Sequence, residues 1–133
     1  MDASEGSLSG SMTIEMSVIV PVFFAVFFLS VMGIFYFHDK DLISSCAYEA
    51  ASCGSLMARE KGGADAGEIE RLFAERMKGK CILFSDVTAK ATVGKEEICV
   101  RVDARKGRMR IGVQETAKVT VPEDEIRKIR RLF

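Results

Sequence analysis

Residues 16–37 read MSVIVPVFFAVFFLSVMGIFYF, 22 consecutive residues without a charged side chain. As an α-helix with a rise of 1.5 Å per residue, this stretch would span about 33 Å, enough to cross a hydrocarbon layer of about 30 Å. Glu15 stands directly in front of it, and Gly10 lies five residues further upstream. The stretch therefore predicts one transmembrane helix close to the N-terminus, and we place it at residues 11–37.

The ten residues before the predicted helix do not have the composition of a secretory signal peptide. They read MDASEGSLSG and contain Asp2 and Glu5 but neither Lys nor Arg. A signal peptide begins with basic residues and has an apolar core of about 7–15 residues, which is shorter than the apolar stretch of this chain. An ordinary cleaved signal is therefore excluded.

The rest of the chain, residues 38–133, is long enough for one small domain with a limited core. The formal charge of the whole chain is balanced, but residues 1–100 hold 9 basic and 14 acidic side chains, whereas residues 101–133 hold 10 and 5. This basic tail has no interleaved aromatic side chains and follows a predicted membrane anchor. We therefore expect no nucleic acid partner, and interpret the tail as a solvated face or an electrostatic contact surface.

The helical pattern continues beyond the apolar stretch. Apolar and small side chains recur at spacings of three and four residues between Leu42 and Met57, and polar side chains take the opposite side. One helix is therefore predicted from about Thr13 to Glu60, where a pair of glycines interrupts it. A second amphipathic helix is predicted over residues 64–80.

From Cys81 onward the period of the pattern changes to two. Apolar and polar side chains alternate over residues 81–93, 98–104 and 109–121, and short polar turns separate the three segments. This pattern predicts a meander of three antiparallel strands. A short amphipathic helix is expected after Pro122, with an acidic first turn and a basic last turn that suit the helix dipole.

The predicted fold class is α+β. A long N-terminal transmembrane helix continues into an extramembrane helix, and this second part packs on a small three-stranded antiparallel sheet. The packing is required because a sheet of three strands with one apolar face is not stable without a cover. The apolar stripe on the helix after the membrane is the available partner.

The sequence from Gly10 to Pro21, GSMTIEMSVIVP, carries a resemblance to a known family. A small Gly, a lone Glu five residues later and a long apolar helix resemble the processing site of type IV prepilins. More closely, the segment is similar to the N-terminus of the TadE-like pseudopilins of tight-adherence pilus systems. The small-residue helix at residues 44–54 also fits that family. The resemblance implies a pilin-like fold, with which the predicted sheet is compatible.

The resemblance implies roles for four of these residues. A leader at residues 1–10 would be cut after Gly10 by a prepilin peptidase, which would make Ser11 the new N-terminus. Glu15 would meet the freed amine of a neighbouring subunit, and Pro21 belongs to the same assembly motif. A carboxylate at the edge of hydrocarbon is unfavourable by a few kcal/mol unless it is paired, and an ammonium group on the next subunit supplies the pair.

On this resemblance we expect a pilin-like subunit or assembly factor of a tight-adherence pilus, without enzymatic activity and without a cofactor. Its expected partners are the prepilin peptidase, other pilin and pseudopilin subunits, pilus assembly proteins and membrane lipid. Its expected location is the cytoplasmic membrane, crossed once, with residues 38–133 outside the cytoplasm, or a cell-surface pilus. Leaders of the family carry basic residues and this one has none, so cleavage after Gly6 stays an alternative.

Side chains that carry catalysis or bind metals are few. His38 stands at the membrane boundary without an accompanying nucleophile, and the cysteines lack paired C-x-x-C spacing. The glycines form no phosphate-binding loop. These observations argue against an enzyme and against a metal site.

The four cysteines, Cys46, Cys53, Cys81 and Cys99, are candidates for disulfide bonds. Cys46 and Cys53 share a helical face but are about 10 Å apart along the axis, too far to bridge each other. The predicted hairpin places Cys99 opposite Thr92 and not opposite Cys81. Bridges would therefore tie the helix to the sheet, with Cys81 on the buried face as the better partner. Four reduced thiols in a small-residue core are an equally good interpretation.

Two other functions are open from the sequence. The flank before the apolar stretch has no basic residue and Lys40 follows it, so the positive-inside rule leans weakly toward a cytoplasmic C-terminal domain. An unprocessed single-pass module that binds or regulates a partner would have this orientation. The third hypothesis is a pseudopilin of a secretion or uptake machine, which would share the processing site.

Overall fold

The computed structural model describes the backbone of residues 3–133 and the side chains of residues 10–133. Most side chains of the predicted leader, and with them the alternative cleavage position at Gly6, lie outside this described part. The chain divides into two compact units, which we call the N-terminal unit, ending at Phe37, and the C-terminal unit, His38–Phe133.

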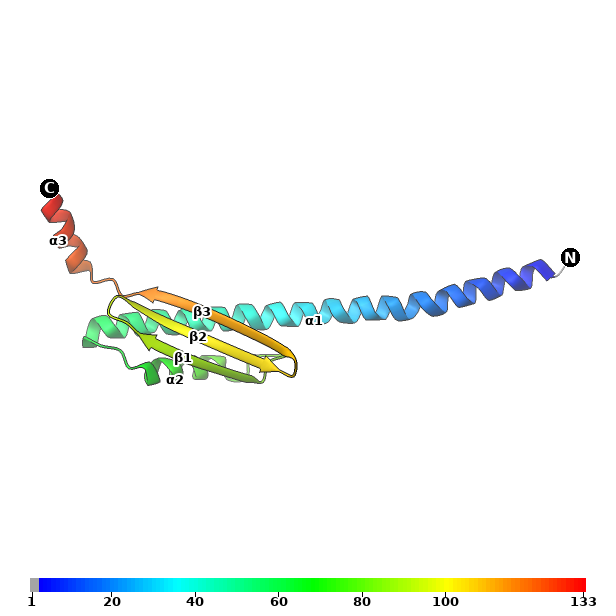
Figure 1. Ribbon diagram of the computed structural model, residues 1–133, viewed down its shortest axis with the longest axis horizontal. Helices are drawn as coiled ribbons and strands as arrows, with labels where there is room; N and C mark the ends of the chain where they lie inside the picture. The colour runs from blue at the N-terminus through cyan, green and yellow to red at the C-terminus, as the bar shows by residue number, and fades with distance from the viewer. Residues whose placement is uncertain (1–2) are drawn as a thin grey trace. The chain divides into compact units, whose positions relative to one another are not determined.

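The first helix, α1 (Ala3–Lys61), is continuous over 59 residues (Figure 1). The unbroken helical pattern predicted this single helix, although α1 begins ten residues before the predicted start at Thr13. Pro21 lies inside it. Membrane helices tolerate an internal proline because neighbouring groups satisfy the backbone that the ring leaves unpaired. The helix ends at Lys61, and the residue that follows, Gly62, has a left-handed φ of 71° that terminates the last turn.

The second helix, α2 (Ala66–Met77), is shorter than the helix predicted over residues 64–80. Asp65 caps its first turn, because the side chain accepts the backbone N–H of Gly67 at 3.2 Å. Gly79, with a φ of 73°, follows its C-terminal end. The buried face of α2 consists of Ile69, Phe73 and Met77.

The predicted three-stranded antiparallel sheet is confirmed. It contains β1 (Asp86–Val93), β2 (Glu97–Lys106) and β3 (Met109–Lys118) in that order, with β2 in the centre. Thr92 of β1 pairs with Cys99 of β2, as the predicted hairpin required. The α+β fold class with one apolar N-terminal helix is therefore confirmed as well.

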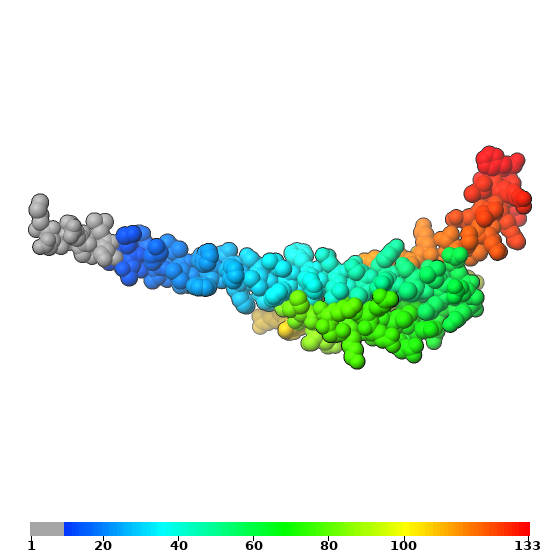
Figure 2. Space-filling view, turned by 180° about the vertical axis from the view of Figure 1, so that it is seen from behind, coloured from blue at the N-terminus to red at the C-terminus, as the bar shows by residue number. Residues whose placement is uncertain are grey.

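The core of the C-terminal unit lies between the sheet and the two helices. Alternate residues of β2 are fully buried while their neighbours turn outward, so one face of the sheet is covered. Seen from behind, the residues of α1 and α2, coloured cyan to green, lie over the sheet (Figure 2). The Ser44 hydroxyl of α1 also donates to Glu115 Oε1 of β3 at 2.6 Å. The buried residues of β2 are Ile98, Val100, Val102 and Ala104.

The strand predicted from Cys81 begins only at Asp86. Leu83 and Phe84 are adjacent and both buried, which breaks the alternation that a strand with one covered face requires. The backbone N–H groups of this segment bond to a side chain of α1 and not to β2. A loop therefore continues the apolar pattern that the sequence assigned to a strand.

The C-terminal end of the chain adds nothing to the core. β3 ends at Lys118, three residues before the Val121 predicted for its end. The last helix, α3 (Pro122–Leu132), has the predicted acidic first turn and basic last turn, and none of its residues is buried. The stability of the C-terminal unit therefore comes from α1, α2 and the sheet.

Candidate functional site

The residues that the sequence associates with processing and assembly lie near the start of α1. Gly10, Ser11 and Glu15 are exposed, and a methyl group added at Gly10 would meet no atom within 4 Å. Ser11 and Glu15 are four residues apart, so the helix places them on one face. Pro21, six residues further on, points about 120° away from Glu15. The structure thus brings Ser11 and Glu15 together and leaves Pro21 outside their face.

The N-terminal unit exposes apolar side chains along its length. Their exposed fractions between Met12 and Leu29 run from 47% at Val20 to 68% at Leu29. The most apolar window of α1 has a mean hydropathy of 2.7, and among the described helices α1 is the one long and apolar enough to cross a membrane. Such a surface suits lipid or the apolar helix of a neighbouring subunit.

The two serine hydroxyls within the apolar stretch of residues 16–37 are satisfied within the helix. Ser17 Oγ donates to the carbonyl of Ile14 at 3.0 Å, and Ser30 Oγ donates to that of Val26 at 2.8 Å. A hydroxyl that is bonded to its own backbone needs no water in a hydrocarbon environment. These two polar side chains are therefore compatible with a membrane span.

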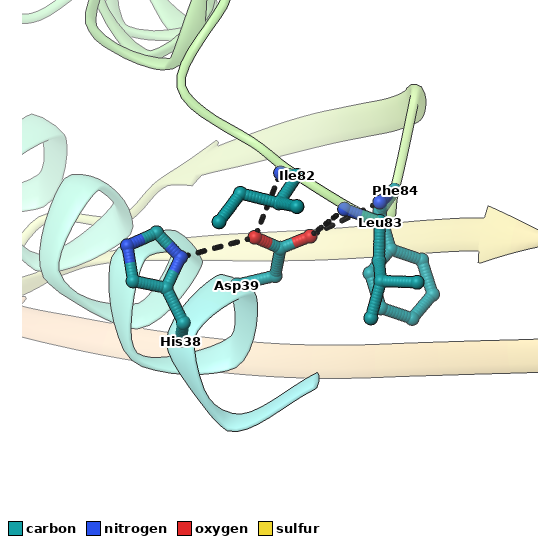
Figure 3. Close-up of polar contacts among 5 residues, drawn as sticks. All are labelled: His38, Asp39, Ile82, Leu83 and Phe84. Carbon is teal, nitrogen blue, oxygen red and sulfur yellow. Dashed lines mark hydrogen bonds and ion pairs between the residues drawn. The ribbon is translucent and has the colours of Figure 1, made fainter. Parts of the chain in front are cut away.

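Asp39, at the start of the C-terminal unit, forms the densest polar contact in the described part of the chain. Its side chain is fully buried. Its Oδ1 accepts the backbone N–H of Ile82 at 2.9 Å, and its Oδ2 accepts those of Leu83 at 2.7 Å and Phe84 at 3.0 Å (Figure 3). His38 Nδ1 lies 3.2 Å from Oδ1. One carboxylate thus holds three consecutive backbone donors of a loop against α1.

Two opposing effects act on the pKa of Asp39. Burial raises it, because the charged form loses water, whereas the N–H groups of Ile82, Phe84 and Leu83 and the ring of His38 stabilise the charge and hold the pKa below its ordinary value. The carboxylate is therefore ionised at neutral pH. In that form it satisfies three backbone donors that need an acceptor when buried.

The pattern of the sequence assigns no role to Asp39. A signal for it exists, because Asp39 lies four, eight and eleven residues before Ile43, Ala47 and Ala50 and shares their buried stripe on α1. A carboxylate on an apolar stripe requires a partner. Its partners are backbone N–H groups 43 to 45 residues away, which have no side-chain signature.

The four cysteines occupy different environments, and all are free thiols. Cys46 is buried on α1, and Cys53 is half-buried two turns further along. Cys99 is half-buried on the outer face of β2, opposite to the buried residues of that strand. The expectation that Cys81 lies on the buried face of the sheet is wrong, because β1 begins five residues later and Cys81 belongs to the loop.

A groove of about 640 Å³ lies between α2 and the edge strand β1. Glu70 lines it, and Glu70 Oε1 accepts the backbone N–H of Ala91 at 3.0 Å. This carboxylate therefore caps an outward-facing donor at the edge of the sheet. Among the residues whose side chains are described, no group of three or more His, Cys, Asp or Glu is placed to hold a metal ion.

Comparison with protein families connects the N-terminal helix with a known group. The model of a family described as TadE-like protein matches residues 10–52. Residues 10–52 are therefore similar to the TadE-like family. The match begins at Gly10 and ends within α1, in the part of the helix that carries the buried stripe. Comparison with curated proteins and with solved structures gives no match.

The TadE-like match confirms the resemblance seen between Gly10 and Pro21. A TadE-like segment that contains a helix of membrane-spanning composition fits a membrane-anchored, pilus-related protein. The match does not extend to α2, the sheet or α3, so the contacts of Asp39 with the loop lie only partly within the TadE-like segment.

Proposed function

We propose that this protein is a pseudopilin-like subunit or assembly factor of a tight-adherence pilus. In this proposal a prepilin peptidase cuts the chain after Gly10, residues 11–37 cross the cytoplasmic membrane once, and residues 38–133 lie outside the cytoplasm. The protein acts through contacts with pilin and pseudopilin subunits and with pilus assembly proteins, and it has no catalytic role.

The observation that carries the proposal is the position of Ser11 and Glu15 at the head of a TadE-like helix. Both are exposed and share one face of α1. A cut after Gly10 would place an ammonium group at Ser11, one helical turn from the carboxylate of Glu15. The face then presents a positive and a negative group at the edge of hydrocarbon, where a neighbouring subunit with the same face can pair with both.

A non-catalytic role is supported by the hydrogen bonds of the buried carboxylate and of the carboxylate that lines the groove. Asp39 is occupied by three backbone donors of the loop, and Glu70 accepts the backbone N–H of Ala91. Both carboxylates thus have structural partners. The C-terminal unit uses them to hold its loop and its sheet edge in place.

The processing step is tested by the intact mass of the protein from its native membrane. We expect a chain that begins at Ser11, and we expect Gly10→Val to retain the leader because a branched side chain would then stand directly before the proposed cut. Gly6→Val is the matched control and leaves the mass unchanged. Retention of Met1 in the wild-type protein would contradict the proposal, and a chain that begins at Ser7 would move the cut to Gly6.

The orientation is tested with Cys99, which is half-buried on the outer face of the sheet. In a variant with Cys46, Cys53 and Cys81 changed to Ala, a membrane-impermeant maleimide should label Cys99 in intact spheroplasts. Labelling that requires lysis would place the C-terminal unit in the cytoplasm. That result would favour the unprocessed single-pass module. The positive-inside rule, applied to Lys40, also weakly favours this orientation.

A further inference from the structure

The outer face of the sheet, which is turned away from the core of the C-terminal unit, carries a group of basic side chains. The residues of β2 that alternate with the buried ones point to this face, and the residues of β1 and β3 paired with them point the same way. The face is turned toward the reader in Figure 1. Four exposed cations occupy it, and we call them the basic face: Lys90, Arg101, Arg105 and Arg110.

The register of the strands arranges these cations as two pairs of like charge. Lys90 of β1 lies directly opposite Arg101 of β2, and Arg105 of β2 lies directly opposite Arg110 of β3. Side chains that are directly opposite in antiparallel strands have Cβ atoms about 4.5–5.5 Å apart, so like charges there destabilise the pairing. An opposite charge supplied from outside the chain would relieve this repulsion.

Two carboxylates share the outer face but do not neutralise it. Asp86 is paired with Arg105 across the strands, and Asp103 lies on β2 between Arg101 and Arg105. The ion pairs formed by the side chains that the structure describes, residues 10–133, include no cation of the basic face. Four positive charges thus accompany two negative ones, and the cations keep hydrogen-bond donors for an external acceptor.

The outer face is hollowed beside the carboxylate of Asp103. One hollow of about 390 Å³ lies over β2 and β3, and its lining includes Arg101, Arg110 and Gln114. Gly112 stands opposite Asp103 and leaves this hollow open because it has no side chain. The other hollow, of about 280 Å³, lies mainly over β1 and β2 and is lined by three cations of the basic face. Each hollow therefore offers donors from at least two strands to an entering carboxylate.

We propose that the basic face is a docking surface for a partner protein that presents carboxylate side chains, with one carboxylate entering each hollow. Charge complementarity selects this partner, because guanidinium groups bind carboxylates through two parallel hydrogen bonds. The strand residues that point to the outer face include no Val, Ile, Leu, Met or Phe, so an apolar helix has little to bury there. A continuous anionic lipid surface would also meet Asp86 and Asp103, whereas separate carboxylates enter the hollows beside them.

The docking surface depends only on the sheet, whereas the statement that its partner is a pilus protein rests on the proposed function. The two can fail separately. Binding of an acidic peptide to the purified protein tests the surface, and the intact mass of the protein from its native membrane tests the processing on which the proposed function depends.

For the test, the full-length protein in a non-ionic detergent is titrated with a fluorescent oligoglutamate peptide at physiological ionic strength. Changing both Arg101 and Arg110 to Glu should weaken binding about tenfold or more, because both hollows lose a cation and gain a repulsive charge. The matched control changes Arg127 and Arg130 of α3 to Glu, which alters the net charge equally. It should keep the affinity within about twofold, because salt screens charges beyond about 8 Å.

The stability of the free protein gives a second readout. Arg101→Gln removes the like-charge pair with Lys90, so it should raise the unfolding temperature at low salt while it weakens peptide binding. A cation with a purely structural role would lower stability when it is replaced. A lowered unfolding temperature of Arg101→Gln together with unchanged peptide binding would therefore overturn the proposal.

Three other results would also overturn it. Equal weakening by the sheet variant and the α3 variant would show attraction to the overall charge and not to the basic face. Self-association of the purified protein that is lost in the sheet variant would assign the face to a second copy of the chain. Displacement of the peptide by glycerol phosphate, at concentrations where free glutamate does not displace it, would assign the face to phosphate headgroups of lipids.

Discussion

The carboxylate of Asp39 accepts the backbone N–H of Leu83 at 2.7 Å, across 44 residues of chain. The same carboxylate holds the donors on either side of Leu83, so a single side chain of α1 fixes the conformation of the loop that leads into β1. The carboxylate and the loop depend on each other. Removing the carboxylate would leave buried backbone N–H groups of the loop without an acceptor.

Replacement of Asp39 should therefore destabilise the C-terminal unit strongly. We expect Asp39→Ala to lower the free energy of unfolding by about 3 kcal/mol or more, since hydrogen bonds to a charged group contribute about 1.5–3 kcal/mol each and are not additive. Asp41→Ala, which removes an exposed carboxylate two residues further on, is the control and should change it by less than about 0.5 kcal/mol. Denaturant unfolding of the full-length protein in detergent measures both. Equal effects of the two substitutions would show that Asp39 does not hold the loop.

The stabilisation by Asp39 should depend on pH in a defined direction. Its pKa is lowered in the folded state, so its contribution is fully present above the ordinary carboxyl pKa of about 4 and is lost as the pH falls through the lowered folded value. The difference in unfolding free energy between the wild type and Asp39→Asn should therefore be largest near neutral pH and shrink below about pH 4. Thermal unfolding as a function of pH checks this expectation. A difference that stays constant down to strongly acidic pH would contradict it.

Gly54 marks the tightest contact between α1, α2 and β2. An added Cβ would lie 2.7 Å and 3.1 Å from two carbons of Ile69 and 3.3 Å from Ile98 Cδ1, and both isoleucines are fully buried. Gly54→Val should therefore destabilise the protein by about 1–3 kcal/mol through overpacking. Gly63→Val is the matched control, because a Cβ there meets no atom within 4 Å. A Gly54→Val protein as stable as that control would mean that the helices can separate at this point at little cost.

Glu15 separates the assembly function from that of a simple anchor. Glu15→Leu should leave insertion into the membrane intact, because an ionised carboxylate opposes burial, and should abolish incorporation into assemblies, because the neighbouring amine then lacks its counter-charge. Glu15→Asp, which is shorter but charged, should be partly active. Crosslinking to partner subunits in the native host measures the effect. If wild type and Glu15→Leu give equal yields of crosslinked partner, Glu15 has no role in assembly.

The last helix, α3, should be dispensable for the fold. Ile126, Ile129 and Leu132 are 62%, 56% and 83% exposed, so the helix buries no apolar side chain. Ending the chain at Val121 should change the free energy of unfolding by less than about 0.5 kcal/mol. Amide hydrogens of α3 should exchange fast, because an isolated helix of this length is marginal in water, whereas those of β2 should be protected. Slow exchange throughout α3 would reveal a partner that covers it.

Local patterns in the sequence were sufficient for most of the fold. The 22 uncharged residues and the spacing of three and four after them predict a single long helix, and the change to a period of two predicts the hairpins, down to Thr92 opposite Cys99. These features depend on neighbours that are close along the chain or across one turn. For that reason they can be predicted from the periodic order of apolar and polar residues.

The parts that could not be predicted depend on distant backbone groups. Leu83 continues the alternation of apolar and polar side chains in β1. Its backbone N–H group, however, donates a hydrogen bond to Asp39 of α1 and not to a neighbouring strand, so the segment forms a loop. For the same reason, the prediction that Cys81 lies on the buried face of the sheet is wrong, and Cys81 belongs to this loop. On the functional side, Gly10 and Glu15 were found from their spacing, and the TadE-like match includes both. The role of each residue in an assembly depends on contacts with a neighbouring subunit. Such contacts cannot be predicted from the sequence of one chain.

The separation between Asp39 and its partners also sets the order of events while the chain is being made. A nascent chain leaves the ribosome with its N-terminus first. Asp39 on the buried stripe of α1 is therefore made more than forty residues before Leu83. Until then the carboxylate has none of its backbone donors and the apolar residues of the stripe have no sheet to cover them. Contacts of such long sequence separation form late, because the intervening loop must close first. A ribosome that stops before Leu83 therefore releases an anchored helix that cannot fold further, with its apolar stripe open to chaperones and proteases.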